Sequence, residues 1–284
     1  MKISPIFEIA IPDTFTSNYG NILQRTVAAG FLSRALSIFQ VEKVYIYREN
    51  VKKPNTRVAR QLFKILSYAE TPQYLRKHIF RKDRDLRYVG LLPPLRTPHH
   101  LLKKPIDDIK RGEVREGVVI LSSKHYSLVY AGLDTPIHVQ ERLPKDSRVT
   151  VEITRIERNK IEGKVVDRCK LREYWGYSVI LLDKGIEDLL KEKRGCLKIL
   201  TSKWGNNVSL MIEELKKSIK RVNRVLIVFG GPQRGLLEIM SEEKAKKLSD
   251  FILNMAPYQA TETIRMEEAV YISLAILNLV RLLP

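Results

Sequence analysis

Three loops containing glycine or small polar residues each follow a predicted buried strand, and they are the segments best suited to hold a ligand. They span residues 201–205 (TSKWG), 229–235 (FGGPQRG) and 254–261 (NMAPYQAT). In an open α/β sheet, ligands bind outside the carboxyl ends of the strands, and glycine lets the backbone approach a ligand closely. The loops match neither a Walker A motif nor the GxGxxG pattern. By themselves they predict either a nucleotide-like ligand at the strand ends or glycine turns without a function.

The elements around these loops alternate between strand and helix, which predicts an α/β fold with a parallel sheet. Apolar runs predict strands at residues 6–11, 41–47, 178–182, 196–200, 224–229 and 251–254. Apolar residues at helical spacing predict helices at residues 19–40, 55–70, 72–80, 185–192, 208–219 and 266–283, and a short helix that begins at residue 241.

A different pattern interrupts this alternation in the middle of the chain. Five short β-like runs separated by turns predict a small closed barrel of the OB type, with strands at 117–121, 126–132, 137–139, 148–157 and 160–167. We therefore expect residues 109–170 to form a barrel inserted into one α/β domain. Residues 1–108 would form the N-terminal part of that domain, and residues 171–284 the C-terminal part with the three loops.

The charge balance favours a polyanionic partner. The chain has 50 Lys and Arg against 32 Asp and Glu, a net charge of +18, which suits nucleic acid first and an anionic membrane surface second. Residues 52–115 hold 17 basic and 6 acidic side chains, an excess of 17 − 6 = 11. This excess indicates either a phosphate-binding surface or a solvated helix face. The barrel is either structural or a binder of single-stranded nucleic acid through basic and aromatic residues, namely Lys124, His125, Tyr126, Arg155, Arg158 and Lys160.

Other site classes are excluded or disfavoured by composition. The two cysteines form no CxxC pair, which argues against a structural zinc site and a disulfide scaffold. Adjacent His99 and His100 do not share a helix or strand face, so we expect no metal there and a role in substrate contact or loop ordering. The longest apolar run, residues 269–280, is too short to span a bilayer, and the N-terminus lacks the pattern of a signal peptide. We expect a cytoplasmic protein without a membrane partner.

Six short stretches, in order over nearly the whole chain, resemble one known family. They are residues 34–41 (RALSIFQV), 90–100 (GLLPPLRTPHH), 115–119 (REGVV), 174–177 (YWGY), 228–232 (VFGGP) and 263–269 (TIRMEEA). Together they resemble the SPOUT methyltransferase superfamily, in the branch of archaeal and eukaryotic RNA methyltransferases that carries an OB-like insertion. The resemblance implies a trefoil knot formed by the three loops, S-adenosylmethionine as cofactor, and a homodimer with each active site at the subunit interface. The C-terminal apolar helix could supply that interface, although plain core packing fits its sequence equally well.

The resemblance also implies roles for individual residues. Arg34, Arg265 and Glu268 would serve catalysis or position the substrate; a helix-surface arginine and favourable charge in a first helical turn are the alternative interpretations. RNA contacts are expected from Arg84, Arg87, Arg96, His99, His100, Lys124 and Arg155. The cofactor would be contacted by Thr201, Ser202, Gly230, Gly231, Pro232, Gly235, Met255, Gln259, Thr263, Ile264 and Ala269.

The expected function is methyl transfer from S-adenosylmethionine to a nucleotide of structured, ribosomal RNA. The chain departs from the family pattern at Trp204, Ala260, Glu262 and Met266, where the family usually has arginine, glycine, arginine and threonine. These departures leave open an RNA-binding protein that keeps the fold with weak or no methyl transfer. Methylation of a protein is a third hypothesis. The sequence does not indicate the target nucleotide or the methylated atom.

Overall fold

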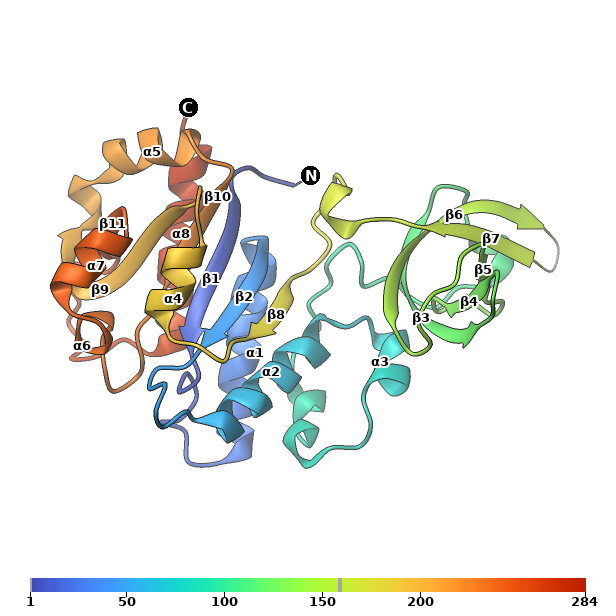
Figure 1. Ribbon diagram of the computed structural model, residues 1–284, viewed down its shortest axis with the longest axis horizontal. Coiled ribbons are helices and arrows are strands. Elements are labelled where there is room, and N and C mark those ends of the chain that lie inside the picture. The colour runs from blue at the N-terminus through green and yellow to red at the C-terminus, as the bar shows by residue number, and fades with distance from the viewer. Residues whose placement is uncertain (1, 158–159) are drawn as a thin grey trace. The chain divides into compact units, whose positions relative to one another are not determined.

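A computed structural model describes residues 2–157 and 160–284 of the chain. These residues form two compact units (Figure 1). The unit that we call the sheet unit comprises Lys2–Ser67, Asp85–Pro93 and Tyr177–Pro284, and the barrel unit comprises Tyr68–Arg84 and Pro94–Gly176. Each unit has an apolar core of its own.

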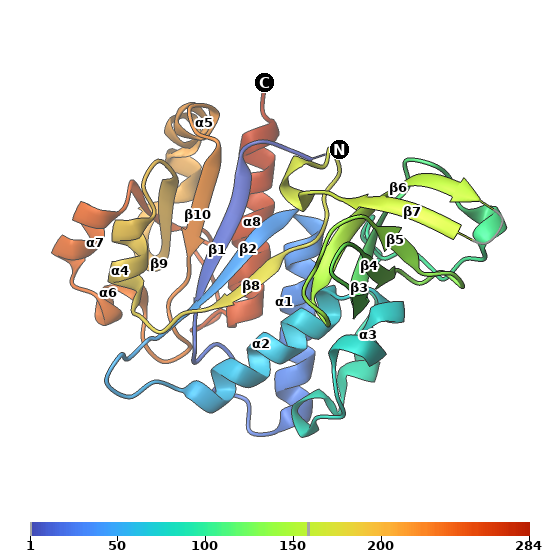
Figure 2. The ribbon, with the colours of Figure 1, turned by 45° about the vertical axis from the view of Figure 1, so that its right-hand side comes forward.

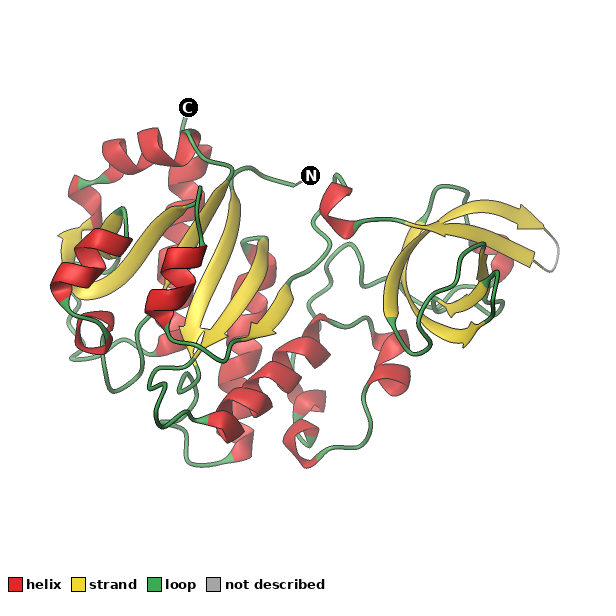
Figure 3. Ribbon diagram, in the orientation of Figure 1, coloured by secondary structure: helices red, strands yellow, loops and turns green. Residues whose placement is uncertain are grey.

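The sheet unit is built on six parallel strands in the order β11-β9-β10-β1-β2-β8 (Figure 3). Neighbouring strands are parallel throughout, so their carboxyl ends share one edge of the sheet. The central strands are buried on both faces, which explains their unbroken apolar runs in the sequence. The predicted parallel sheet is confirmed, with strands β1 (Ile6–Pro12), β2 (Val41–Tyr47), β8 (Ser178–Leu181), β9 (Leu197–Asn207), β10 (Arg224–Val228) and β11 (Phe251–Asn254).

Helices cover both faces of this sheet (Figure 2). Helices α1 and α8 lie together on one face, and α4, α6 and α7 lie on the other. Helix α1 begins after Asn21, whose side chain accepts a hydrogen bond from the backbone of Gln24. Gly30 is buried within α1. A Cβ atom there would lie 2.5 Å from the side chain of Leu92, so a larger residue would force that side chain to move. The helices are α1 (Ile22–Ile38), α2 (Thr56–Glu70), α4 (Ile186–Glu192), α5 (Ile212–Lys220), α6 (Leu236–Ile239), α7 (Glu242–Leu248) and α8 (Met266–Leu282).

The barrel unit contains a closed five-stranded barrel with the strand order β3-β4-β5-β7-β6. All neighbouring pairs are antiparallel except β5 and β7, which are parallel. Alternate residues such as Val129, Val151 and Ile161 fill its interior. The predicted small closed barrel is confirmed and is compatible with an OB-like fold. Its elements are α3 (Gln73–Ile79), β3 (Val114–Ser122), β4 (Ser127–Tyr130), β5 (Ile137–Val139), β6 (Arg148–Glu157) and β7 (Lys160–Val165).

A buried polar cluster lies inside the barrel unit, which includes Glu70, the last residue of α2. Arg148 on β6 forms ion pairs with Glu70 and Glu116, each with an N–O distance of 2.5 Å. The indole of Trp175 donates a hydrogen bond to the Glu116 carboxylate at 2.6 Å. Burial by itself would raise the pKa of Glu70, but Arg148 and His99 outweigh it and hold that pKa at about 2. The carboxylate is therefore ionised at neutral pH, deep inside the unit.

Neither cysteine forms a disulfide among the described residues. Cys169 is exposed in the barrel unit, and Cys196 is half-buried in the sheet unit. Within the described ranges, none of the helices combines the length and apolar character that crossing a membrane requires.

Candidate functional site

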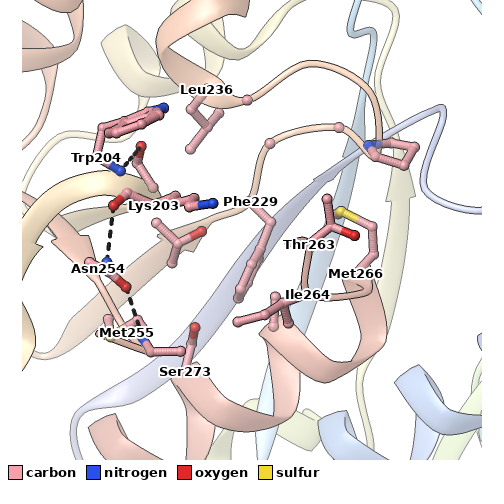
Figure 4. A pocket seen from close by; sticks show the side chains of 18 of the residues that line it. Lys203, Trp204, Phe229, Leu236, Asn254, Met255, Thr263, Ile264, Met266 and Ser273 are labelled. Atoms are coloured by element: carbon pink, nitrogen blue, oxygen red, sulfur yellow. Dashed lines mark hydrogen bonds between the residues drawn. The ribbon is translucent and has the colours of Figure 1, made fainter. Parts of the chain in front are cut away.

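A cavity of about 510 Å³ opens beside the middle of β9 and at the carboxyl ends of β10 and β11 (Figure 4). It is lined by residues 201–204 within β9, by the segments that follow β10 and β11, and by the first turns of α8. Its walls combine apolar side chains, such as Phe229 and Leu236, with the hydroxyl groups of Thr201 and Ser202. The volume and the mixed lining are typical of sites for small molecules and cofactors.

The residues expected to contact the cofactor all line this one cavity: Thr201, Ser202, Gly230, Gly231, Pro232, Gly235, Met255, Gln259, Thr263, Ile264 and Ala269. Lys203, Phe229 and Asn254 line the cavity as well; they lie in the three loops predicted to hold a ligand, although they were not among the individual contacts expected. Sequence reasoning missed Ser273, which lies four residues after Ala269 on α8. The helical i, i+4 spacing is the signal that would have found Ser273.

The first cavity segment corrects the prediction that this strand ends at residue 200. Strand β9 continues to Asn207, but its register against β11 is broken in the middle. Ile252 pairs with Leu200, whereas the next residue, Leu253, pairs with Asn206. Residues 201–205 therefore leave the ladder and project from it, and we call this segment the β9 excursion.

Glycine is required where the β9 excursion rejoins the sheet. A Cβ atom on Gly205 would lie 2.6 Å from the backbone of Leu253. Asn254 fastens the excursion to the next cavity segment, because its side-chain amide donates to the carbonyl of Lys203 at 3.0 Å. The excursion is thus held in place by the strand beside it.

The second cavity segment, after β10, is a tight turn built on two glycines. A Cβ atom on Gly230 would lie 2.7 Å from the backbone nitrogen of Leu236, and one on Gly231 would lie 2.3 Å from the Glu49 carboxylate. The turn closes with a hydrogen bond from the Gly231 N–H to the carbonyl of Arg234 at 2.8 Å. Without side chains here, the backbone itself forms this wall of the cavity.

The third cavity segment runs from Asn254 to the start of α8. The side chain of Gln259 donates to the carbonyls of Thr261 and Glu262 at 2.8 and 3.2 Å. The ammonium group of Lys203 also reaches the Glu262 carbonyl, at 3.2 Å. Ala260 stands where the family usually has glycine, but its backbone is not in the left-handed conformation that favours glycine. In this segment the residue with a positive φ is Tyr258.

The three residues expected to serve catalysis do not line the cavity of their own chain. The carboxylate of Glu268 accepts a hydrogen bond from the backbone N–H of Arg265 at 2.9 Å, so it caps the start of α8. Arg34 is half-buried on α1 beside α8, where its charge partly offsets the rise in the pKa of Tyr271 that burial causes.

A buried carboxylate lies next to the cavity at the start of α8. Glu267 is nine-tenths buried and accepts a hydrogen bond from the Tyr19 hydroxyl through one oxygen. Its other oxygen is buried without a hydrogen-bond partner among the described residues. Burial and then Glu267 raise the pKa of Tyr19 to about 12, so the hydroxyl keeps its proton. This contact links the loop after β1 to α8.

The residues expected to bind RNA divide between exposed and buried positions. Arg84, Arg96, Lys124 and Arg155 are exposed in the barrel unit, and Arg87 is exposed in the sheet unit. His125, Tyr126 and Lys160 are exposed as well, whereas Arg158 lies outside the described residues.

Of the two histidines expected to contact RNA, His99 is buried and His100 is partly buried. His99 is fully buried and therefore has no surface to offer to RNA. Its ring nitrogens lie 3.1 Å from the Thr97 hydroxyl and 2.9 Å from the Glu70 carbonyl, and His100 bonds the same carbonyl at 2.7 Å. Burial lowers the pKa of His100 to about 4, which keeps its ring neutral. Both side chains order the loop that contains them. Within residues 2–157 and 160–284, no group of three or more His, Cys, Asp or Glu side chains is placed to hold a metal ion.

Comparison with known proteins assigns the chain to a family. A family model described as "Putative RNA methyltransferase" matches residues 7–277. The human 28S rRNA (uridine-N(3))-methyltransferase is 32% identical, in an alignment covering 95% of this chain and 77% of the human protein. The mouse protein of the same name is 31% identical, over 95% of this chain and 75% of its own length. An uncharacterized protein of Halobacterium salinarum is 28% identical, over 95% of this chain and 98% of its own length. The extent of these matches confirms the resemblance, and the chain belongs to this family of RNA methyltransferases.

Proposed function

We propose that this protein transfers a methyl group from S-adenosylmethionine to N3 of a uridine in ribosomal RNA. The observation that carries the cofactor assignment is that eleven residues singled out in the sequence converge on one cavity. The names of the human and mouse relatives support the RNA class and the acceptor atom. The exposed basic residues of both units, together with the net charge of +18, suit RNA as the partner.

The residues present fit this cofactor. The apolar side chains of Phe229, Leu236 and Ile264 suit the adenine ring, and the polar groups of Thr201 and Ser202 suit its hydrogen-bonding edges. Gly230 and Gly231 let the cofactor approach the backbone. When bound, S-adenosylmethionine supplies an electrophilic methyl group on a sulfonium. We further propose that the three cavity segments form the SPOUT trefoil knot.

The task of the protein is alignment and proton removal. The cavity would hold the cofactor, and the task of the surrounding residues would be to orient the acceptor nitrogen towards its methyl group. The N3 proton would pass to water, and a positive charge near the base would favour the anion that results. We assign this role to Arg34.

We propose a homodimer in which Arg34 acts in the cavity of the other chain. Helix α1 exposes four large apolar side chains, Leu23, Val27, Phe31 and Ile38, which suit a second copy of the same face. Helix α8, the expected source of the interface, exposes Leu279 and Leu282 near its end. Arg34 lies between Phe31 and Ile38 on α1, at the face that we propose to be shared.

The first test is calorimetric titration with S-adenosylmethionine and S-adenosylhomocysteine. We expect micromolar binding with one cofactor per chain, and transfer of labelled methyl groups to ribosomal RNA that yields N3-methyluridine. Lack of binding up to millimolar cofactor, with and without RNA, would overturn the proposal in favour of an RNA-binding protein. Label in protein but not in RNA would establish a protein substrate instead.

The second test addresses Arg34. We expect Arg34→Ala to abolish transfer while sparing cofactor binding. We expect Gly235→Trp to abolish both, because Gly235 lines the cavity and a Cβ atom there meets nothing within 4 Å. Mixing the two inactive variants should restore part of the activity, because a mixed dimer combines an intact cavity with the partner's Arg34. If the two variants exchange subunits and activity still does not return, Arg34 does not act in the cavity of the other chain.

A further inference from the structure

Two aromatic side chains on the cavity segments are almost fully exposed. Trp204, in the β9 excursion, is 79% exposed and lines the cavity, and Tyr258, in the third segment, is 95% exposed. Its neighbour Gln259 lines the cavity as well. Burial of a ring of this size is among the largest apolar contributions to stability. Two such rings left in water beside one cavity therefore indicate a binding role.

The segments that carry the two rings are held by hydrogen bonds. The backbone N–H of Trp204 donates to the Ser202 hydroxyl at 3.2 Å. Asn254 joins the two segments, because its amide donates to the Lys203 carbonyl and its side-chain oxygen accepts from the N–H of Ala256 at 3.0 Å. Figure 4 shows Trp204 at the edge of the cavity beside Leu236, with Asn254 between Lys203 and Met255. The rings are thus presented from a preformed scaffold.

The backbone at Tyr258 is strained. Its φ is +61°, a left-handed conformation that bulky side chains rarely adopt. Such strain persists only where the surrounding structure enforces it, and it gathers at functional sites. Here it coincides with a ring that points fully into solvent, so it contributes no packing in return.

We propose that Trp204 and Tyr258 stack on bases of the RNA substrate and hold the target nucleotide, unstacked from its neighbours, at the mouth of the cavity. A base inside a helix cannot present its edge to a buried methyl donor, so it must be taken out of the stack. Aromatic side chains accept any base, because every base has a π face. Lys203 and Arg265 are exposed on the same two segments and suit the neighbouring phosphates. The inference rests on the proposed function for its substrate, but its stacking contacts can be measured without methyl transfer.

Fluorescence and RNA affinity test the proposal directly. The chain has two tryptophans, and Trp175 is buried in the barrel unit. Titration with a twelve-nucleotide oligouridylate should quench the emission of the wild-type protein, and the quench should disappear in Trp204→Ala. We expect Trp204→Ala and Tyr258→Ala each to weaken oligouridylate binding about 5- to 150-fold. Tyr258→Ala, which lies outside the cavity lining, should leave S-adenosylhomocysteine affinity unchanged. Trp204→Phe and Tyr258→Phe should retain most of the RNA affinity.

A matched control and two contrary outcomes complete the experiment. Leu210 is 83% exposed outside the cavity lining, so Leu210→Ala should change nothing. Wild-type RNA affinity in both alanine variants would overturn the proposal. Quenching by S-adenosylhomocysteine alone, with cofactor affinity lost in Trp204→Ala, would also overturn it and assign Trp204 to the adenine of the cofactor. If the wild-type protein binds no cofactor but its RNA quench is present, the proposed function fails while the stacking surface stands.

Discussion

Glu70 is held ionised in the interior of the barrel unit, and this single charge makes the stability of the protein depend on pH. The fold lowers its pKa from 4.5 to about 2, so the ionised form stabilises the fold above pH 4.5 and this contribution is lost as the pH falls towards 2. The lowering of the Glu70 pKa corresponds to about 3 kcal/mol of folding free energy.

We expect the unfolding temperature of the wild-type protein to fall between about pH 5 and about pH 3. Glu70→Gln should be less stable at neutral pH and less dependent on pH in that range. The exposed Glu157→Gln should behave as wild type. An unchanged pH profile in Glu70→Gln would refute this role.

The Tyr19 hydroxyl satisfies one oxygen of the buried Glu267 carboxylate, and the other oxygen has no partner among the described residues. Tyr19→Phe would leave both oxygens without a donor. Because an unsatisfied buried acceptor is destabilising, we expect a loss of about 1–3 kcal/mol in the free energy of unfolding, measured in urea. Cofactor affinity should fall as well, since α8 begins at the cavity wall. Tyr126→Phe, at an exposed barrel position, is the control. Equal stability of the two variants would show that the Tyr19 contact is dispensable.

At the scale of elements, the turn after β10 depends on backbone proximity. Gly230→Ala places a Cβ atom 2.7 Å from the nitrogen of Leu236, whereas Gly235→Ala in the same turn meets nothing within 4 Å. We expect Gly230→Ala to lower the unfolding temperature measurably and to weaken cofactor binding by distorting the cavity wall. Gly235→Ala should keep the unfolding temperature of the wild type. Equal unfolding temperatures of the two variants would mean that the turn can shift to accommodate a Cβ atom at residue 230 with little loss of stability.

Local patterns were sufficient to predict most elements, and the failures have a common cause. Strand β10 and the strands of the barrel are apolar or alternating runs that their own residues define. The continuation of β9 to Asn207 follows from pairing with β11, about 50 residues away, and polar residues 201–205 give no sign of it. His99 is buried where its ring contacts the carbonyl of Glu70, which lies 29 residues earlier in the chain, so local sequence gives no sign of this burial. The residues of the cavity were predicted through the family resemblance. The glycine turns alone are equally compatible with a ligand-binding site and with turns that have no function.

At the scale of the whole molecule, the exposed apolar face of α1 is the surface on which we propose that a second copy binds. Phe31 is 54% exposed in the middle of that face, so a charge at this position should disrupt the proposed dimer. We expect the wild-type protein to sediment as a dimer and Phe31→Glu as a monomer that retains its fold and loses methyl transfer. Leu102→Glu is the control, because Leu102 is also apolar, is 75% exposed and lies in the barrel unit. A monomeric wild-type protein would remove the basis for placing Arg34 in trans.

The distribution of the two thiols has a practical consequence for studying motion. Cys169 is exposed in the barrel unit, whereas Cys196 is half-buried in the sheet unit and burial raises the pKa of its thiol. Because the thiolate is the reactive form, a maleimide dye should label Cys169 first, and a second dye should label Cys196 only slowly. The natural chain therefore accepts a donor and an acceptor fluorophore in sequence, one in each unit. Single-molecule energy transfer between them would measure whether the distance between the two units changes when RNA is added, without any engineered residue.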